Sequence, residues 1–482
     1  MTLLQQIKNQ FSRFTAGSPA IKASMAYMFC TLLQKGISTL TTPIFTRLLT
    51  TEQYGYYSIF HSWLAVIKIF STLLLAETAY TQALVKFPDQ KHPMTSAVAG
   101  LGTMTTLIVS VCYFLFREQF NALTGADTFL ITCILITAWE ELIFDLWAIQ
   151  QRVSYWYKPL LIITVFTTIC KPALGICAVL ATDVWKAQAR IIASVAVDVL
   201  AYSGFFLLFI KRGKSLFNKR HWRYFLSFSI PLIPHYLTRI ILNQSDRLMI
   251  QTMVGYSEAG IYALAHSLAW LLTLISHGLL NTVNPWVFQK LKARDFAPIA
   301  HTTLMTSALV ACAGLGLTVI APEIVSIFAP PAYHAAIWII PPLVASVFFQ
   351  FIYSIFIDFE YYYETKNYLL AASIPGGLLN IVLNYRFIPR FGYLAAGYTT
   401  LACYSFMAVT HYCCVRIIMK KKENDLKVYA LKPLLLLVVA FLLASAVCML
   451  TYSVPLLRYA LLTGSAAILF LKRDCLLKLL RS

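Results

Sequence analysis

The chain has 482 residues, of which 59% are hydrophobic and only 12% are charged, and its mean hydropathy is +0.69. These values exclude a soluble globular domain, in which about 25% of residues are charged, and they indicate an all-α polytopic membrane protein. The formal net charge of +19 would suggest a nucleic-acid partner in a soluble protein. Here the basic residues follow membrane topology instead, so no nucleic-acid partner is expected.

The first twenty residues carry apolar side chains at helical spacing but no continuous apolar core. This pattern predicts a short amphipathic helix on the membrane surface over residues 1–20, rather than a cleavable signal peptide. The apolar positions are Leu4, Ile7, Phe11 and Phe14.

About fourteen apolar runs follow, each of roughly 17 to 25 residues and therefore long enough to cross a bilayer as a helix. They are centred near residues 38, 65, 105, 138, 168, 200, 238, 269, 310, 346, 376, 404, 441 and 464. Alternate loops, counted from the N-terminus, hold about 27 of the 39 Lys and Arg residues, and the opposite loops hold about six. The positive-inside rule therefore predicts that both termini are cytoplasmic and that the number of spans is even.

A polar pattern near the first span is repeated about 200 residues later, near the seventh. In both copies an Arg ends one apolar segment and a Gly-x-Tyr-x-x-x-His-Ser sequence opens the next. The copies comprise Arg47, Gly55, Tyr57, His61 and Ser62, and Arg247, Gly260, Tyr262, His266 and Ser267. Because six spans separate them, the repeat predicts two pseudo-symmetric six-helix lobes, arranged in parallel around a central cavity. The expected divisions are an N-lobe over residues 21–220, a C-lobe over 221–420, and two additional C-terminal spans over 421–482.

Polar side chains form stripes on the first two spans of each predicted lobe. A charge near the bilayer centre costs on the order of 3 kcal/mol, so these side chains should face protein or water. The stripes predict a wet, cationic central cavity that binds substrate through Lys35, Arg47, Lys68, Arg239, Arg247, His61, His266 and Trp270. Alternatives stay open, because Arg47 and Arg247 could snorkel or pair with nearby acids, and the histidines could be ordinary helix-packing residues.

Acidic residues in or near the spans are candidates for ion coupling, namely Glu141, Asp145, Asp198 and Asp246. Glu141 and Asp145 are one helical turn apart, and the alternative is that they pair with Lys171 and other buried cations. Pro43, Pro231 and Pro234 interrupt the lining helices and are candidate hinges, because a proline removes a backbone hydrogen bond.

The sequence argues against an enzyme. The eleven cysteines show neither metal-ligand nor Cys-x-x-Cys spacing, so neither a metal nor a disulfide framework is expected. No Ser/His/Asp set, phosphate-binding loop or pair of carboxylates at a membrane face is recognisable, and no cofactor is expected.

Residues 35–55, from Lys35-Gly36-Ile37 to Gln53-Tyr54-Gly55, closely resemble the opening of bacterial polysaccharide flippases. These are the O-antigen and exopolysaccharide repeat-unit translocases of the multidrug/oligosaccharidyl-lipid/polysaccharide (MOP) superfamily. The segment from Asp246-Arg247 to Gly260-Ile261-Tyr262 resembles the junction of that family's seventh and eighth spans, and Asn284-Pro285-Trp286 resembles the end of the eighth. The resemblance extends over essentially the whole chain.

The resemblance implies a flippase of the bacterial inner membrane that turns an oligosaccharide linked to undecaprenyl diphosphate from the cytoplasmic to the periplasmic face by alternating access. Desolvated diphosphate needs Arg or Lys, which the predicted cationic stripes would supply. Trp270, Tyr57 and Tyr262 are candidate stacking faces for sugar. Membrane lipid is a further expected partner, and a polysaccharide polymerase and a chain-length regulator are candidates.

One departure leaves the subclass open. Relatives of this class often have twelve spans, whereas lipid II flippases of the superfamily have fourteen. The competing functions are a lipid II-type flippase, a multidrug or cation antiporter of the same superfamily and, as a more distant alternative, a polysaccharide polymerase or ligase. An antiporter of cations would favour an anionic cavity, and a polymerase or ligase a large periplasmic loop.

Overall fold

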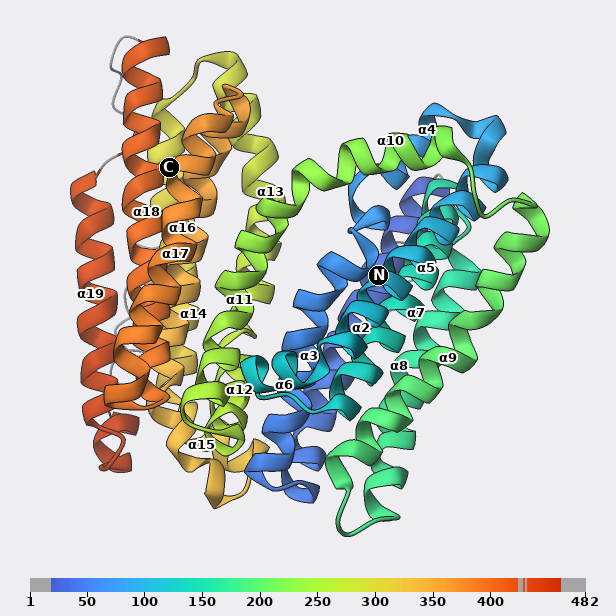
Figure 1. Cartoon of the computed structure of the whole chain (residues 1–482). Coiled ribbons are helices and arrows are strands. Elements are labelled where there is room, and N and C mark those ends of the chain that lie inside the picture. Colours follow the sequence, from blue (N-terminus) through green and yellow to red (C-terminus); the bar gives the residue numbers. More distant parts are fainter. Residues whose placement is uncertain (1–18, 424–427, 430, 461–482) are drawn as a thin grey trace, which may run out of the picture. The chain divides into compact units, whose positions relative to one another are not determined.

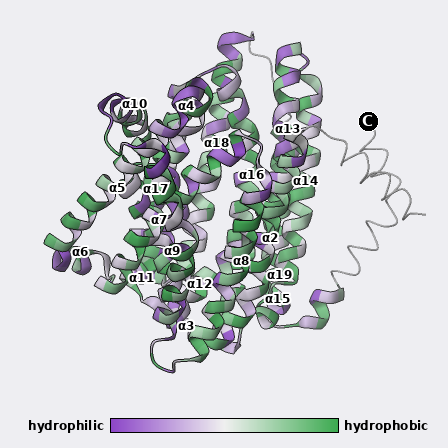
Figure 2. Cartoon of the chain, turned by 90° about the vertical axis from the view of Figure 1, so that its right-hand side faces the viewer, coloured by the Kyte–Doolittle hydropathy of each residue, from purple (hydrophilic) through white to green (hydrophobic). Residues whose placement is uncertain are grey.

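The computed structural model describes residues 19–423, 428–429 and 431–460, and their helices are labelled in Figure 1. Most of the predicted amphipathic segment 1–20, and the span predicted near residue 464, lie outside these residues. Within them the chain is helical and contains no β-strand. This confirms the predicted all-α class, and Figure 2 shows that hydrophobic residues dominate the long helices, whereas α4 and α10 are more hydrophilic.

The described chain divides by its internal contacts into two units, Met1–Ile240 and Ile241–Ser482. The division falls inside α11, twenty residues after the predicted boundary between the lobes, so α10 and the start of α11 belong with the first unit. The elements of the first unit are α2 (Pro19–Leu48), α3 (Thr51–Thr72), η1 (Ala76–Tyr80), α4 (Thr81–Lys86), η2 (Pro88–Gln90), α5 (Lys91–Leu115), α6 (Arg117–Thr124), α7 (Thr128–Val153), α8 (Tyr157–Leu180), α9 (Lys186–Gly213), α10 (Lys219–Ser229) and η3 (Ile230–Leu232).

Helix α11 (Ile233–Met253) leads into the second unit. The elements that follow are α12 (Tyr256–Ala269), α13 (Leu272–Ala293), α14 (Ala297–Val319), α15 (Ala321–Phe328), η4 (Pro331–Trp338), α16 (Ile340–Tyr362), α17 (Lys366–Phe391), α18 (Leu394–Lys422) and α19 (Leu431–Leu450).

Nine helices among the described residues are long and apolar enough to cross a membrane, or up to eleven if each of two bent helix pairs counts as one span. Every predicted span centre from 38 to 441 falls inside a helix. Helices α2 and α7 are not among the nine, and α7 carries Glu140, Glu141 and Asp145 near its middle. The chain is a multi-pass membrane protein, and the count of fourteen spans stays a prediction.

Each unit is packed around one or two central helices. In the first, α3 and α9 both pack against α7, and α2 packs against α8. In the second, α16 contacts α13, α14 and α18, and 78% of its apolar window is buried, compared with 17% for α19. Helix α16 therefore forms the core of its unit, and α19 lies at its margin.

The turn between α2 and α3 follows directly from the sequence of the first repeat copy. The Thr50 side chain accepts a hydrogen bond from the Gln53 backbone N–H, and the Gln53 side chain accepts one from the Thr50 backbone N–H. This capping box satisfies two backbone donors that the first turn of a helix leaves unpaired. It fixes the start of α3, which carries His61 and Lys68.

Helix α3 ends in a sharp bend that the sequence does not signal. Leu73 and Leu74 adopt left-handed backbone conformations, with φ of 50° and 51°. The chain then continues through the single π-helical turn η1, and the helices on either side differ in direction by 68°. The second predicted span is therefore broken near its C-terminal end, which the predicted topology places toward the cytoplasm.

The candidate hinge prolines occupy three different settings. Pro43 lies inside α2, which continues through it, and Pro231 lies in η3, just before a bend in the chain. Pro234 is the second residue of α11, where its missing N–H breaks no helical hydrogen bond. It lies in the short break between the bent segments Lys219–Leu232 and Tyr236–Met253.

Candidate functional site

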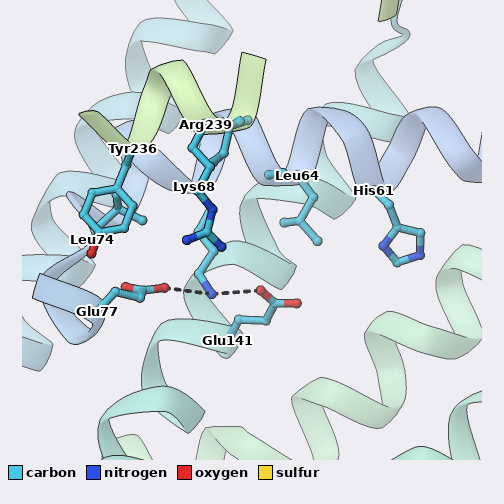
Figure 3. Close-up of a pocket in the computed structure, with 10 residues that line it drawn as sticks. His61, Leu64, Lys68, Leu74, Glu77, Glu141, Tyr236 and Arg239 are labelled. Carbon is cyan, nitrogen blue, oxygen red and sulfur yellow. Dashed lines mark hydrogen bonds and ion pairs between the residues drawn. The ribbon is translucent and has the colours of Figure 1, made fainter. Parts of the chain in front are cut away.

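A cavity of about 300 Å³ lies within the first unit, between α3, η1, α7 and the start of α11. Lys68, His61 and Leu64 line it from α3, at positions that share one helical face. Figure 3 shows Tyr236 and Arg239 lining the same cavity from α11. Six of its lining residues are polar or charged and four are apolar.

Lys68 is held by three carboxylates beside this cavity. Its Nζ lies 2.9 Å from Asp145 Oδ2, 3.1 Å from Glu141 Oε2 and 3.5 Å from Glu77 Oε1. Glu141 and Asp145 are one turn apart on α7, and the bend after α3 places Glu77 near Lys68 (Figure 3). The Lys68 side chain is only 17% exposed, so these charges interact with little screening by water.

The lining of this cavity carries charges of both signs, whereas the sequence predicted a cationic lining for a central cavity between the lobes. Lys68 and Arg239 are balanced by Glu77 and Glu141, so the formal charge of the lining is zero with the histidine neutral. Asp145, which contacts Lys68 but is outside the described lining, brings the formal charge of the whole group to −1. The prediction rested on polar stripes along single helices, and such stripes do not reveal acids that neighbouring elements contribute. The open alternative for Glu141 and Asp145 was pairing with a buried cation, and the cation that they contact is Lys68.

The other predicted cations lie elsewhere. Lys35 and Arg47 on α2 are exposed, outside the described lining of the cavity, and Arg247 lies half-buried in the second unit. Arg47 Nη1 donates to the Pro43 carbonyl at 3.0 Å, and Arg247 Nη2 donates to the Asn243 carbonyl at 3.4 Å. Both arginines thus donate a hydrogen bond to the backbone carbonyl four residues earlier, so the two copies of the repeat share this local contact.

The aromatic residues of the repeat make different contacts in the two copies. The Arg190 guanidinium lies 3.4 Å from the centre of the Tyr57 ring, which leaves that face of the ring covered. Tyr262 is 0% exposed and cannot stack against sugar in this conformation, contrary to expectation. His266 stacks on Trp270 with ring centres 4.8 Å apart, and both remain partly exposed.

Asp198 forms a second ion pair within the first unit. Its Oδ1 lies 2.7 Å from Lys171 Nζ, which joins α9 to α8, and the Asp198 side chain is 1% exposed. Glu140 nearby accepts a hydrogen bond from Ser203 Oγ at 2.7 Å. Neither acid is part of the described lining of the cavity, so their positions favour a role in joining helices.

Asp246 accepts four hydrogen bonds within the second unit, all from neutral side chains. Tyr262 Oη and Thr400 Oγ1 donate to one carboxylate oxygen at 2.6 and 2.5 Å, and the Asn384 and Asn380 amides donate to the other at 2.6 and 3.1 Å. The carboxylate therefore joins α11 to α12, α17 and α18. Asn380 and Asn384 were missed, although two amides one turn apart in an apolar helix are a recognisable signal.

A second buried pair was also missed in the second unit. His411 Nδ1 on α18 lies 2.7 Å from Glu360 Oε1 on α16, and both side chains are 0% exposed. A histidine in the middle of an apolar run and an acid near the end of another were the available signals. Their contact could not be foreseen, because it depends on how α16 and α18 pack.

Comparison of the sequence with known proteins identifies a matching family and two relatives. The family described as polysaccharide biosynthesis protein matches residues 20–290. The chain is 21% identical over 208 residues to Lsg locus putative protein 1 of Haemophilus influenzae, a match that covers 40% of this chain and 50% of that protein. It is 23% identical over 287 residues to an uncharacterized membrane protein of the same organism, covering 56% and 66%. The chain thus spans about half to two thirds of the length of these curated relatives.

Solved structures share the fold over more of the chain. A lipid II flippase, MurJ, in an inward closed conformation is similar with a TM-score of 0.65 and 15% identity, over 95% of this chain and 100% of that one. An inward-facing multidrug resistance MATE family transporter of the MOP superfamily gives a TM-score of 0.60 and 12% identity, over 81% and 96%. These similarities show a fold common to MOP-superfamily transporters.

Proposed function

We propose, because the chain belongs to the family of polysaccharide biosynthesis proteins, that it flips an undecaprenyl-diphosphate-linked oligosaccharide across the bacterial inner membrane. The cargo would be the repeat unit of an O-antigen or a related polysaccharide, moved from the cytoplasmic to the periplasmic face by alternating access. Membership of the family, over residues 20–290, is the observation that carries the proposal. The transporter fold and the polar cavity of the first unit support it.

Arg239 and Lys68 are the proposed diphosphate ligands. A guanidinium can bind two phosphate oxygens at once, and an ammonium supplies a compact positive charge. Both residues line the 300 Å³ cavity, and His61 and Tyr236, which line it beside them, are the proposed contacts for sugar hydroxyls. Lys35, Arg47, Arg247, His266 and Trp270 remain proposed contacts for other steps along the transport path.

The three carboxylates make ion uptake part of this proposal. Lys68 is already neutralised by three carboxylates, which would repel a dianionic diphosphate, and repulsion is strong where water is scarce. Protons bound by Glu77, Glu141 or Asp145 would remove this negative charge and free Lys68 for phosphate. Substrate binding and cation uptake would then be linked, and each would strengthen the other.

Asp198 and Asp246, also candidates for ion coupling, are better explained as anchors between helices. Asp198 is paired with Lys171, and Asp246 already accepts four hydrogen bonds. A proton on Asp246 would have to displace or reorient one of these donors. Glu141 and Asp145 therefore become the proposed coupling residues.

One observation favours a different function. Three carboxylates beside a cavity would suit a cationic substrate, as in a multidrug or cation antiporter. Efflux of a fluorescent cationic dye from cells that contain or lack the protein distinguishes the two functions. Dye efflux without any effect on lipid-linked sugars would favour the antiporter.

Deletion of the gene tests the main proposal directly. The expected result is accumulation of an undecaprenyl-diphosphate-linked oligosaccharide on the cytoplasmic face, with loss of the polymer and restoration by the wild-type gene. Radiolabelled lipid extracts identify the intermediate. If none accumulates and only polymer length changes, the flippase proposal fails and a polymerase-related role takes its place.

A further inference from the structure

A second cavity, of about 530 Å³, runs along one side of α10. Its volume lies within the range of small-molecule binding sites, roughly 300 to 1,000 Å³. We call it the α10 groove, and its principal lining residues are Phe217, Lys219, Trp222, Arg223, Leu226 and Ile230. All of them lie within the first unit, and none belongs to the cavity around Lys68.

The side of α10 next to the groove is firmly packed, and Trp222 belongs to both. Phe225 is completely buried, and the Trp222 indole N–H donates to the Ala97 carbonyl of α5 at 2.8 Å. The Ser229 hydroxyl lies 2.7 Å from the Thr78 hydroxyl of η1. These contacts fix the rotation of α10 about its axis, and therefore which of its side chains line the groove.

The groove changes character along its length. Lys219 and Arg223, one turn apart, supply positive charge toward the start of α10, and both are exposed. Leu226 and Ile230 continue the same helical face with apolar side chains. Phe217 and Ile230 are 65% and 52% exposed, so apolar surface lies open beside the cations.

A headgroup with negative charge joined to a hydrocarbon chain matches this gradient. Amphipathic helices with basic polar faces bind membrane surfaces in this way, and each Lys or Arg near an anionic surface contributes to the attraction. The segment between α9 and α10 is the basic loop that the positive-inside rule places at the cytoplasmic face, where anionic lipids are attracted to such clusters. A zwitterionic lipid would supply the chain but no net charge.

We propose that the α10 groove binds one anionic phospholipid, with its phosphate at Lys219 and Arg223 and an acyl chain along Leu226 and Ile230. The apolar end of the groove reaches Pro231, two residues before the bend between α10 and α11. The bound lipid would therefore lie beside the bend. The site does not depend on which substrate the protein transports.

Native mass spectrometry of the full-length protein tests the site. The protein is released from detergent that contains phosphatidylglycerol or phosphatidylethanolamine with the same acyl chains. Wild-type protein is expected to retain phosphatidylglycerol preferentially. In the double variant K219Q/R223Q this preference should fall by on the order of tenfold. The matched control K214Q/R220Q removes the same charge from exposed positions of the same segment, outside the groove lining, and should stay within about twofold of wild type.

A third variant separates the groove from charge alone. Ser227→Trp places a large ring in the groove while leaving both cations, and it should also reduce phosphatidylglycerol retention. Thermal unfolding in detergent checks that each variant is folded. The proposal fails if both charge variants lose phosphatidylglycerol equally, if the wild type retains the two lipids equally, or if S227W retains as much phosphatidylglycerol as the wild type. It also fails if undecaprenyl phosphate displaces phosphatidylglycerol.

Discussion

Lys68 Nζ lies 2.9 Å from Asp145 Oδ2, an ion pair that joins α3 to α7 one turn before α3 breaks. Glu141 and Glu77 complete the cluster, so the same ammonium also connects the two sides of the bend. The cluster combines a structural link with charges that can change on ion binding. Its structural and coupling roles require separate tests.

Lys68→Gln should destabilise the first unit. The substitution leaves three carboxylates close together without their cation, and removal of one partner from a buried ion pair costs about 3–5 kcal/mol. Because the three carboxylates are 32–34% exposed, we expect a smaller loss, about 1–3 kcal/mol. Thermal unfolding in detergent measures it.

The triple variant K68Q/E141Q/D145N provides the control for that experiment. It removes the unpaired charges as well, so most of the lost stability should return. If K68Q alone unfolds at the wild-type temperature, Lys68 does not stabilise the three carboxylates as the short distances indicate.

Glu141→Gln and Asp145→Asn should weaken the dependence of transport on pH. In the wild type, protonation of the cluster favours an anionic substrate, so binding of the lipid-linked diphosphate should decrease as pH rises. Each variant removes one negative charge permanently, which should raise binding at high pH and flatten the profile. Proteoliposome binding and flipping, measured across a pH series, give both quantities.

Glu118→Gln on α6 is the matched control, because Glu118 is exposed and lies outside the described lining of the cavity. It should keep the wild-type profile. A flat profile in the wild type itself would argue against proton coupling at this cluster.

The positions of the long helices could be predicted from the sequence, whereas the charges around the cavity could not. Long apolar runs determine helices almost independently of context, because every backbone polar group must be satisfied inside a membrane. The bend at Leu73 and Leu74 has no such signal, because leucine favours the regular helix and neither glycine nor proline is present. That bend brings Glu77 to Lys68, and the packing of α3 against α7 brings Glu141 and Asp145, so the local charge depends on tertiary structure.

Arg239→Gln should reduce translocation strongly. Loss of a guanidinium from a phosphate site costs about 1.5–3 kcal/mol, which corresponds to roughly ten- to a hundredfold. Arg239→Lys retains charge without the planar fork and should give an intermediate value. Complementation of a deletion strain and flipping in proteoliposomes are the measurements.

Arg390→Gln, at an exposed position near the end of α17, serves as the matched control and should translocate normally. Full activity of R239Q would remove Arg239 from the proposed diphosphate site, although the family assignment would stand.

Asn384→Leu should destabilise the second unit. The substitution removes the amide that donates to Asp246 at 2.6 Å, and it leaves a 4% exposed carboxylate with one fewer donor. Loss of a hydrogen bond to a buried charged group costs about 1.5–3 kcal/mol. Thermal unfolding of N384L and of the double variant N384L/D246N shows whether the loss depends on the charge of Asp246. Equal unfolding temperatures for N384L and the wild type would contradict the anchoring role of Asp246.

Leu73→Gly and Leu73→Val distinguish the bent α3 from a continuous helix. At φ of 50° a leucine is strained, glycine is not, and a β-branched side chain is strained further. With the bend present, L73V should therefore be less stable than L73G by about 1–2 kcal/mol, even though valine retains more apolar surface. In a continuous helix the order would reverse, because glycine is the poorer helix former by roughly 0.5 kcal/mol or more. Unfolding temperatures of the two variants, measured side by side in one detergent, decide between these outcomes.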